Sequence, residues 1–335
     1  MTYLRVNDDR LAVLLLLVLG FLMTNVAKYD LPILPKSYAT STLNRSSFPA
    51  DFVFGTASSS YQHSSLCLRS HIFGFMVSFC SPRVRLMKME EDLAFGTISP
   101  TCTQEDVGMM NDMGLDAYRF SISWPRILPQ DEYGGFLSAR AIDDYRDFVD
   151  ICFDEFGDRI KHWITLNEPW TYSHHGYATG TFPPGRCSAW QQLNCTGGDS
   201  GTKPYLVAHH LLLAHAAAVK LYKEKYQGAI GITLVSQWFE PYSNSVKDRK
   251  AALRAFDFML GWYLDPLVNG DYPYSMHSLV GGRLPKFSNE QSEVMKDSFD
   301  FIGMNYYGAD YAQNAPQILI PSYTSDSCTN LTSEN

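Results

Sequence analysis

A single glutamate beside an amide is the feature of this sequence that could do chemistry. Glu168 follows Asn167 and precedes Pro169, directly after the apolar run 163–166. A carboxyl group at the end of a strand can act as a general acid toward a glycosidic oxygen, and a neighbouring amide can hold a sugar hydroxyl. The alternative is that Glu168 is an exposed loop acid. Residue types and spacing alone leave both interpretations open.

Other polar or aromatic side chains interrupt or follow apolar runs in the same way. Arg119 stands inside the run 116–121, where it is either part of a site or a structural ion-pair partner. The others are Gln62 after residues 52–57, Gln237 and Trp238 after 230–235, and Asn305 and Tyr307 after 301–304. If these runs are parallel strands, their carboxyl ends share one face, and these side chains gather near Glu168.

Helical patterns separate the apolar runs. Residues 107–113 end at Gly114, the repeat of 142–156 ends at Gly157, Pro204 opens a long helix that ends before Gly228, and residues 249–262 are helical. Strands that are continuously apolar and alternate with helices indicate a parallel sheet covered on both faces. We therefore predict an α/β fold of the barrel type. The alternative is a doubly wound open sheet, but no GxGxxG motif or P-loop supports it.

Composition excludes several classes of function. The chain has 335 residues, within the range of one α/β barrel, and its formal net charge is −8. No long Lys/Arg run occurs, so nucleic acid is not an expected partner. No CxxC or HExxH spacing occurs, and we expect neither a metal nor a cofactor.

The N-terminus predicts a secreted protein. Arg5 and Arg10 precede the apolar run 11–23, which is short for a membrane span and fits the apolar region of a signal peptide. We predict a signal peptide over residues 1–27 and no membrane segment after its removal; the alternative is an uncleaved anchor. The expected route is secretory, to the extracellular space (apoplast) or a vacuole.

Glycosylation sequons and cysteines fit that route. The sequons begin at Asn44, Asn194 and Asn330. Cys187 and Cys195 bracket one loop and could form a disulfide in an oxidising lumen; the alternative is two free thiols.

The residues around Glu168 resemble the plant branch of glycoside hydrolase family 1. The segment Leu166-Asn167-Glu168-Pro169 matches that family's acid/base motif. Further matching segments are 117–124, 134–137, 184–187, 207–210, 257–262, 270–273 and 301–307. The likeness covers residues 48–62 and 105–335, with gaps. It implies a (β/α)8 TIM barrel over residues 48–335 and a retaining O-β-glucosidase that acts on small-molecule plant β-glucosides.

The resemblance also implies roles for individual residues. Glu168 is similar to the acid/base, and the related plant thioglucosidases carry Gln at this position. Arg119 and Tyr307 are similar to the groups that hold the nucleophile's carboxylate. The implied substrate-binding residues are Gln62 for the glycone, Asn167 for the 2-hydroxyl, Asn305, and Trp170, Gln237 and Trp238 for the aglycone. Cys187 and Cys195 are similar to the family's loop disulfide.

The chain departs from the family in three places. Its 335 residues reach only the sixth-strand equivalent, whereas the family's nucleophile lies on the seventh strand. Residues 128–130 run directly into 131–135, so the third strand and its helix are absent. We therefore expect an incomplete barrel without its third, seventh and eighth strands, with exposed strand edges.

The third departure is the segment 63–104, which does not match the family. Residues 87–96 correspond to a family peptide read one base out of frame, if suitable codons are chosen, and we interpret 63–104 as an aberrant segment that lacks a matching βα unit. Three interpretations follow for function. Either the chain is a β-glucosidase by descent, inactive as it stands because the nucleophile is absent, or it is a non-catalytic β-glucoside-binding pseudoenzyme or the non-functional product of a defective gene model.

Overall fold

The computed structural model describes residues 44–50, 52–57, 76–80, 104–122, 124, 134–158, 160, 162–195 and 197–333. They belong to two compact units, divided between Phe52 and Val53. In the first unit, the 3-10 turn η3 (Arg45–Ser47) is capped by Asn44, whose Oδ1 accepts from the Ser46 backbone N–H at 2.9 Å. The predicted signal peptide lies outside the described residues. None of the described helices is long and apolar enough to cross a membrane.

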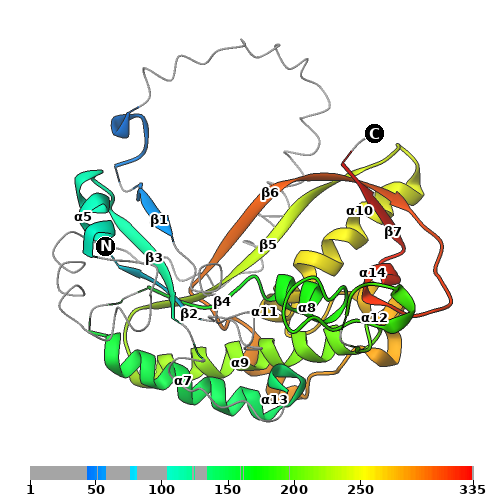
Figure 1. Ribbon diagram of the computed structural model, residues 1–335, viewed down its shortest axis with the longest axis horizontal. Helices are drawn as coiled ribbons and strands as arrows, with labels where there is room; N and C mark the ends of the chain where they lie inside the picture. The colour runs from blue at the N-terminus through cyan, green and yellow to red at the C-terminus, as the bar shows by residue number, and fades with distance from the viewer. Residues whose placement is uncertain are drawn as a thin grey trace. The chain divides into compact units, whose positions relative to one another are not determined.

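The second unit is built on one mixed sheet (Figure 1). Its strands are β1 (Gly55–Ala57), β2 (Met76–Cys80), β3 (Ala117–Ile122), β4 (His162–Asn167), β5 (Ala229–Pro241), β6 (Phe301–Asn314) and β7 (Thr329–Thr332). The spatial order is β1-β3-β2-β4-β5-β6-β7. The pairs β1–β3, β4–β5 and β5–β6 are parallel. Among the described strands, β1 and β7 stand at the two ends of the sheet. They do not pair with each other, so the sheet does not close.

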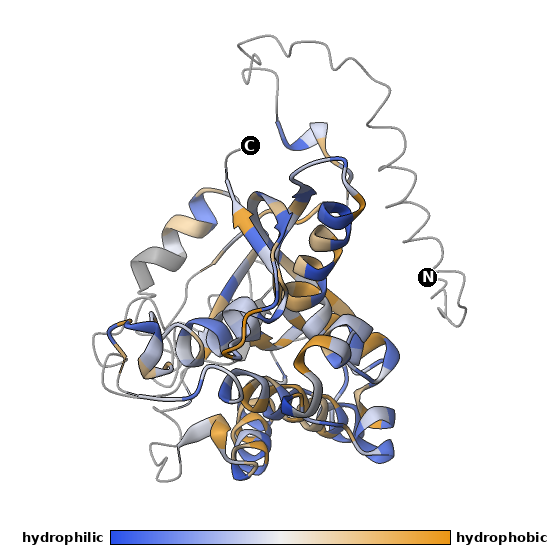
Figure 2. Cartoon of the chain, turned by 90° about the vertical axis from the view of Figure 1, so that its right-hand side faces the viewer, coloured by the Kyte–Doolittle hydropathy of each residue, from blue (hydrophilic) through white to orange (hydrophobic). Residues whose placement is uncertain are grey.

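Helices connect these strands. They are α5 (Gln104–Asp112), α7 (Arg140–Phe156), α8 (Pro169–Tyr177), α9 (Lys203–Lys225), α10 (Val246–Phe256), α11 (Trp262–Asn269), α12 (Tyr274–Val280), α13 (Asn289–Met295) and α14 (Tyr323–Asp326). Short turns are η4 (Gly135–Leu137), η5 (Ala189–Gln191) and η7 (Gly281–Arg283), and η6 (Asp257–Gly261) is a π-helical turn. Along the helices, apolar and polar residues are interleaved (Figure 2).

The strands expected from the apolar runs all form, with different lengths. β5 and β6 continue well past the predicted 230–235 and 301–304 and stay paired to Pro241 and Ala312. We predicted a buried strand over residues 52–57. The observed strand is shorter and largely exposed, so the prediction is wrong on both counts. β1 has three residues, of which Gly55 and Ala57 are exposed, because β1 lies at the end of the sheet and pairs only with β3 among the described strands.

Residues 76–80 are the unexpected element. β2 lies between β3 and β4 and runs antiparallel to both, where a βα repeat would place a parallel strand. A strand thus forms inside the segment that we interpreted as aberrant, although it is not the barrel's repeating unit. The rest of that segment, apart from Gln104 at the start of α5, lies outside the described residues.

The predicted helix 249–262 is helical throughout, and it is divided into α10, the π turn η6 and the start of α11. Ser245 caps α10 by accepting the Asp248 backbone N–H at 3.0 Å, and the helix then passes through the π turn η6 into α11. Pro266 lies inside α11 and has no N–H to donate one turn back. The π turn η6 adds a residue to one helical turn, and the spacing of apolar residues in the sequence does not reveal this addition.

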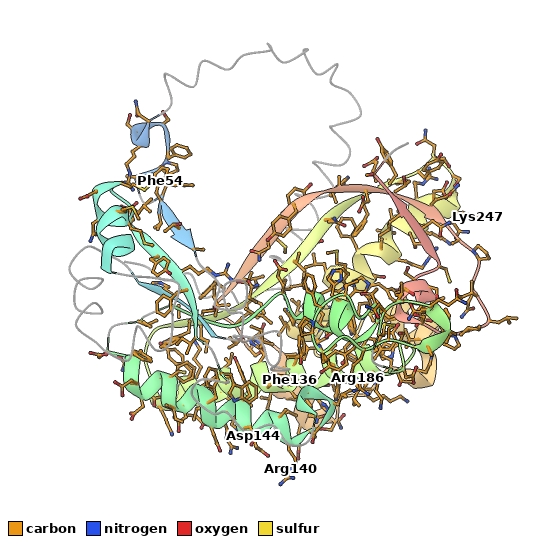
Figure 3. The ribbon with its side chains drawn as sticks, in the orientation of Figure 1. Phe54, Phe136, Arg140, Asp144, Arg186 and Lys247 are labelled. Atoms are coloured by element: carbon orange, nitrogen blue, oxygen red, sulfur yellow. A yellow bond between two sulfur atoms is a disulfide. The ribbon has the colours of Figure 1, made fainter. Side chains whose placement is uncertain are left out.

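The core between the sheet and its helices is aromatic. Phe153 of α7, Trp163 of β4 and Tyr222 of α9 are buried, with ring centroids 5.1 Å (Phe153–Trp163) and 4.8 Å (Phe153–Tyr222) apart. Phe136 of η4 is also buried, whereas Arg140 at the start of α7 points outward (Figure 3). The close β5–β6 approach requires Gly231, since a Cβ there would stand 2.1 Å from the Phe301 carbonyl oxygen.

Three buried histidines of α9, His209, His210 and His215, make folding sensitive to acid, because burial lowers the pKa of each. His215 shares a 2.6 Å hydrogen bond with Thr165 Oγ1, and His209 shares one of 2.9 Å with the Tyr272 hydroxyl. Burial lowers the pKa of His209 and His215 from about 6.5 to about 4. Between these values the unfolded chain binds protons that the folded chain does not, so stability is complete above pH 6.5 and is lost as the pH falls toward 4.

We expect the free energy of unfolding to fall by up to about 1.4 kcal/mol per pH unit for each of His209 and His215 below pH 6.5. Asp265 opposes this below pH 6, because burial raises its pKa to about 6. Urea denaturation at pH 7.5, 6.5 and 6.0 measures the effect where Asp265 interferes least. A stability that is flat over this range would contradict the assignment.

Candidate active site

The backbone of Glu168 is held in an uncommon conformation at the end of β4. Its φ of 50° and ψ of 57° are left-handed, and it is the N-cap of α8, with Pro169 at the first helical position. Such a conformation costs about 1–2 kcal/mol for a residue other than glycine, so neighbouring contacts must maintain it. One of them is the Glu168 backbone N–H, which donates to the Thr233 carbonyl of β5 at 2.9 Å. The strained turn directs the chain from the strand into α8.

Three donors hold the Glu168 carboxyl group. Oε1 accepts from Asn305 Nδ2 at 2.5 Å and from the Tyr307 hydroxyl at 3.3 Å, both on β6. Oε2 accepts from Thr171 Oγ1 at 2.8 Å, one turn into α8. The carboxyl group is therefore fixed from two elements that are far apart in sequence, which gives it a defined direction for proton transfer.

Asn167 links this carboxyl group to Arg119 of β3. Asn167 Oδ1 accepts from Arg119 Nη2 and, at 3.3 Å, from Asn305 Nδ2. Burial lowers the pKa of Arg119, and the Glu168 carboxylate and Tyr307 oppose that shift. Arg119 Nε is buried without a hydrogen-bond partner, and no carboxylate among the described residues forms an ion pair with Arg119. The described cluster thus contains one cation and one carboxyl group.

Tyr307 is the solvent-exposed member of this cluster. Its side chain is 75% exposed, yet its hydroxyl reaches Glu168. Desolvation and the Glu168 carboxylate both raise its pKa, so the hydroxyl stays protonated at neutral pH and can donate. One edge of β6 pairs with β5. On its other edge, the only strand partner among the described residues is β7, which pairs with Tyr311–Asn314. The cluster is therefore accessible from this side.

The residues predicted for the aglycone side, Trp170, Gln237 and Trp238, lie on α8 and β5. Trp170 follows Pro169 on α8, and its Nε1 donates to the Tyr323 hydroxyl at 2.5 Å. Gln237 stands at an irregularity in the β5–β6 pairing. Trp238 turns toward α10, with its Nε1 on Glu240 at 2.9 Å and its ring 5.5 Å from Phe256. Gln62 lies outside the described residues.

Sequence reasoning missed two residues, Thr171 and Tyr323. Thr171 stands three positions after Glu168, the spacing at which an N-cap side chain meets the first turn of a helix. That signal was available, but α8 itself was not predicted. Tyr323 lies 153 positions from Trp170, and no local pattern connects them.

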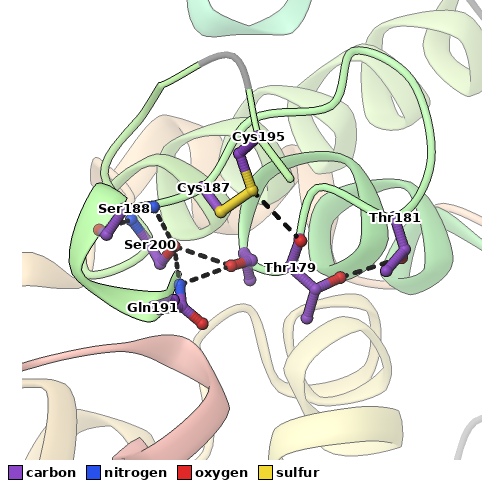
Figure 4. Close-up of a disulfide and its surroundings, with 8 residues drawn as sticks. Thr179, Thr181, Cys187, Ser188, Gln191, Cys195 and Ser200 are labelled. Carbon is purple, nitrogen blue, oxygen red and sulfur yellow. Dashed lines mark hydrogen bonds between the residues drawn. A yellow bond between two sulfur atoms is a disulfide. The ribbon is translucent and has the colours of Figure 1, made fainter. Parts of the chain in front are cut away.

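The predicted disulfide is present, so the alternative of two free thiols is wrong. Cys187 and Cys195 are bonded, with Cα atoms 5.6 Å apart (Figure 4). Ser200 braces the same loop, since its Oγ accepts from the Ser188 backbone N–H at 2.9 Å and donates to the Ala178 carbonyl at 2.7 Å. The three sequon asparagines are exposed, which glycosylation requires: Asn44, Asn194 and Asn330.

Comparison with protein families identifies one match. The model for glycosyl hydrolase family 1 matches residues 44–132 and 130–334. The two matched stretches meet at residues 130–132, where the sequence indicated an absent βα unit.

Known relatives agree with that match. The chain is 48% identical over 342 residues to β-glucosidase 12 of Oryza sativa subsp. indica, with 87% of this chain and 67% of the relative aligned. It is 47% identical over 348 residues to the cyanogenic β-glucosidase of Trifolium repens, covering 88% of this chain and 81% of the relative.

Solved structures show the same architecture. The rice Os3BGlu6 β-glucosidase superposes with a TM-score of 0.72 at 37% identity, over 86% of this chain and 71% of the rice chain. A family 1 β-glucosidase of the fungus Humicola insolens gives a TM-score of 0.68 at 28% identity, over 84% of this chain and 69% of the fungal chain. The open sheet is therefore part of a (β/α)8 barrel, as predicted, and Glu168 lies at the carboxyl end of its strands.

Proposed function

Because the chain belongs to glycosyl hydrolase family 1, we propose that its site acts on β-glucosides by a retaining mechanism, with Glu168 as the acid/base. The observation that carries this proposal is the fixed carboxyl group at the end of β4, held by Asn305, Tyr307 and Thr171. A retaining glycosidase uses such a group first to protonate the departing oxygen and then to activate water.

The residues around Glu168 support recognition of a sugar. The Asn167 amide group lies beside the carboxyl group and can bond to the glucose 2-hydroxyl with its Nδ2, since its Oδ1 is taken by Arg119 and Asn305. Gln62 is proposed to bind the glycone. Hydrogen bonds to the 2-hydroxyl strengthen in the oxocarbenium-like transition state of this reaction.

The aglycone side is proposed to lie along α8 and β5. Trp170, Gln237 and Trp238 are the proposed residues of this side, and indole rings suit flat apolar groups. The sequence has glutamate at position 168, which favours O-glucosides as substrates. The relatives' names, β-glucosidase 12 and cyanogenic β-glucosidase, agree with a small-molecule plant β-glucoside.

Secretion is part of the proposal. The N-terminal segment 1–27 has the composition of a signal peptide. A disulfide between Cys187 and Cys195 and three exposed sequons suit an oxidising, glycosylating compartment. On these grounds we propose an extracellular or vacuolar location.

The stereochemistry of the product tests the proposed function. We expect a chimera that supplies the remaining length from rice β-glucosidase 12 to hydrolyse an aryl β-glucoside and release β-glucose first, because two successive displacements retain configuration. Proton NMR of the anomeric signal during the first turnovers measures this. Early release of α-glucose, or equal hydrolysis of the matching α-glucoside, would contradict the proposal.

A further inference from the structure

The indole of Trp170 is held by a residue from the far end of the chain. Trp170 Nε1 donates to the Tyr323 hydroxyl at 2.5 Å, and that hydroxyl donates to the Phe258 carbonyl at 2.6 Å. Tyr323 opens the short turn α14, drawn beside α8 in Figure 1. The hydroxyl therefore uses its single proton on Phe258 and a lone pair on Trp170.

The Tyr323 ring is itself fixed. It is 6% exposed and stacks on Trp262 of α11 at 4.7 Å between centroids, with an interplanar angle of 24°. Its backbone N–H donates to the Ser200 carbonyl at 2.9 Å. Burial raises the pKa of the hydroxyl, which stays protonated, so the direction of the two hydrogen bonds does not reverse with pH.

A buried ion pair anchors the turn that carries Tyr323. Asp326 is 5% exposed, and its two oxygens bond to Arg283 of η7 at 2.7 and 2.8 Å. The Tyr205 hydroxyl adds a third bond to Asp326 at 2.7 Å. Buried contacts therefore hold both ends of α14, the turn that carries Tyr323.

Trp170 follows Glu168 by two positions at the start of α8, and its ring lies near that of His175. The His175 and Trp170 rings are 5.7 Å apart, and the charge of Glu168 opposes the burial that lowers the pKa of His175. The His174 ring lies 4.5 Å from the same indole. The His174 ring also lies 5.3 Å from the Tyr323 ring, so the three rings form one cluster. That cluster holds the partly exposed Trp170, two positions after the group that would protonate the leaving oxygen.

We propose that Tyr323 is a positioning residue for aromatic leaving groups: its hydroxyl fixes the indole of Trp170 in the orientation that receives a flat aglycone. The proposal rests on the proposed function, because it assigns Trp170 to the aglycone side. A fixed ring loses little conformational freedom when a second ring stacks on it, which favours aryl over alkyl glucosides.

The test uses the ¹⁵N-labelled 335-residue chain and the variant Tyr323→Phe. The Trp170 indole N–H resonance, assigned by its loss in Trp170→Phe, is expected to shift in Tyr323→Phe because its acceptor is removed. Titration with phenyl and methyl β-glucoside follows on the same signals. We expect about fivefold weaker binding of phenyl β-glucoside in Tyr323→Phe, as for one lost hydrogen bond, with methyl β-glucoside unchanged.

The matched control is Tyr222→Phe. Tyr222 is also buried, and its hydroxyl donates to the Gln227 carbonyl at 3.2 Å at the end of α9. This variant should change neither the Trp170 signal nor the preference for phenyl β-glucoside. An unmoved Trp170 signal in Tyr323→Phe overturns the positioning role, and an unchanged phenyl-to-methyl ratio overturns the role in specificity. If the unmutated chain binds neither glucoside, the role in specificity is overturned, while the indole signal still decides the positioning. The proposed function is decided separately, by the stereochemistry of the product that the chimera releases.

Discussion

The 335-residue polypeptide is expected to accelerate aryl β-glucoside hydrolysis by no more than about 10²–10⁴-fold, the contribution of general acid catalysis alone. Whole enzymes reach about 10⁶-fold or more. A retaining mechanism needs a second carboxylate about 5–5.5 Å from the first, to capture the sugar as a covalent intermediate. Glu168 can protonate the leaving oxygen, but a lone acid does not stabilise the oxocarbenium-like centre that remains.

The described contacts agree with this expectation. The resemblance assigns Arg119 and Tyr307 to the nucleophile's carboxylate. In the structure, Tyr307 bonds to Glu168 and Arg119 bonds to Asn167, and no second carboxylate among the described residues bonds to either. Both groups are thus turned toward the acid/base side of the site.

Release of p-nitrophenol from p-nitrophenyl β-glucoside measures the activity. The 335-residue polypeptide is compared with the chimera that includes the remaining length of rice β-glucosidase 12, under the same conditions. Activity should return with the chimera. Robust turnover by the 335-residue polypeptide, unchanged by Glu168→Gln, would show that the chemistry has another source.

The sequence predicted the framework of this site because each part of it is a local pattern. Continuous apolar runs predicted β3, β4, β5 and β6, and the polar residues that follow the runs 163–166 and 301–304 meet at Glu168. Arg119 looked anomalous in an apolar run, and the structure places it in the cluster. A change from apolar to polar residues therefore marked where the site side chains lie, although β5 and β6 continue beyond that change.

The parts that sequence reasoning missed depend on pairing between distant segments. The antiparallel strand β2 is defined by its neighbours β3 and β4, and it lies in the segment that was interpreted as aberrant. The bond from Trp170 to Tyr323 spans 153 positions. The length of β6 beyond residue 304 comes from pairing with β5 and, near its end, with β7. Such features arise from tertiary packing, which overrides local propensity.

Glu168→Gln, made in the chimera, should lower kcat/KM for phenyl β-glucoside by about 10²–10⁴-fold, because phenol is a poor leaving group that needs a proton. With 2,4-dinitrophenyl β-glucoside the first displacement needs little acid assistance, so kcat/KM should fall far less. Hydrolysis of the intermediate should still be slow without a general base. A burst of dinitrophenol followed by slow turnover is the expected result in stopped-flow measurements.

The glutamine variant is a clean test because it preserves the contacts of position 168. The amide oxygen can accept from Asn305 and Tyr307 as Oε1 does, and the amide nitrogen can donate to Thr171 Oγ1, since a hydroxyl also accepts. Glu224→Gln, at an exposed position of α9, controls for the loss of one negative charge and should leave both substrates unaffected. If Glu168→Gln lowers kcat/KM equally for the two leaving groups, Glu168 does not deliver the proton, and its fixed position in the cluster serves the fold.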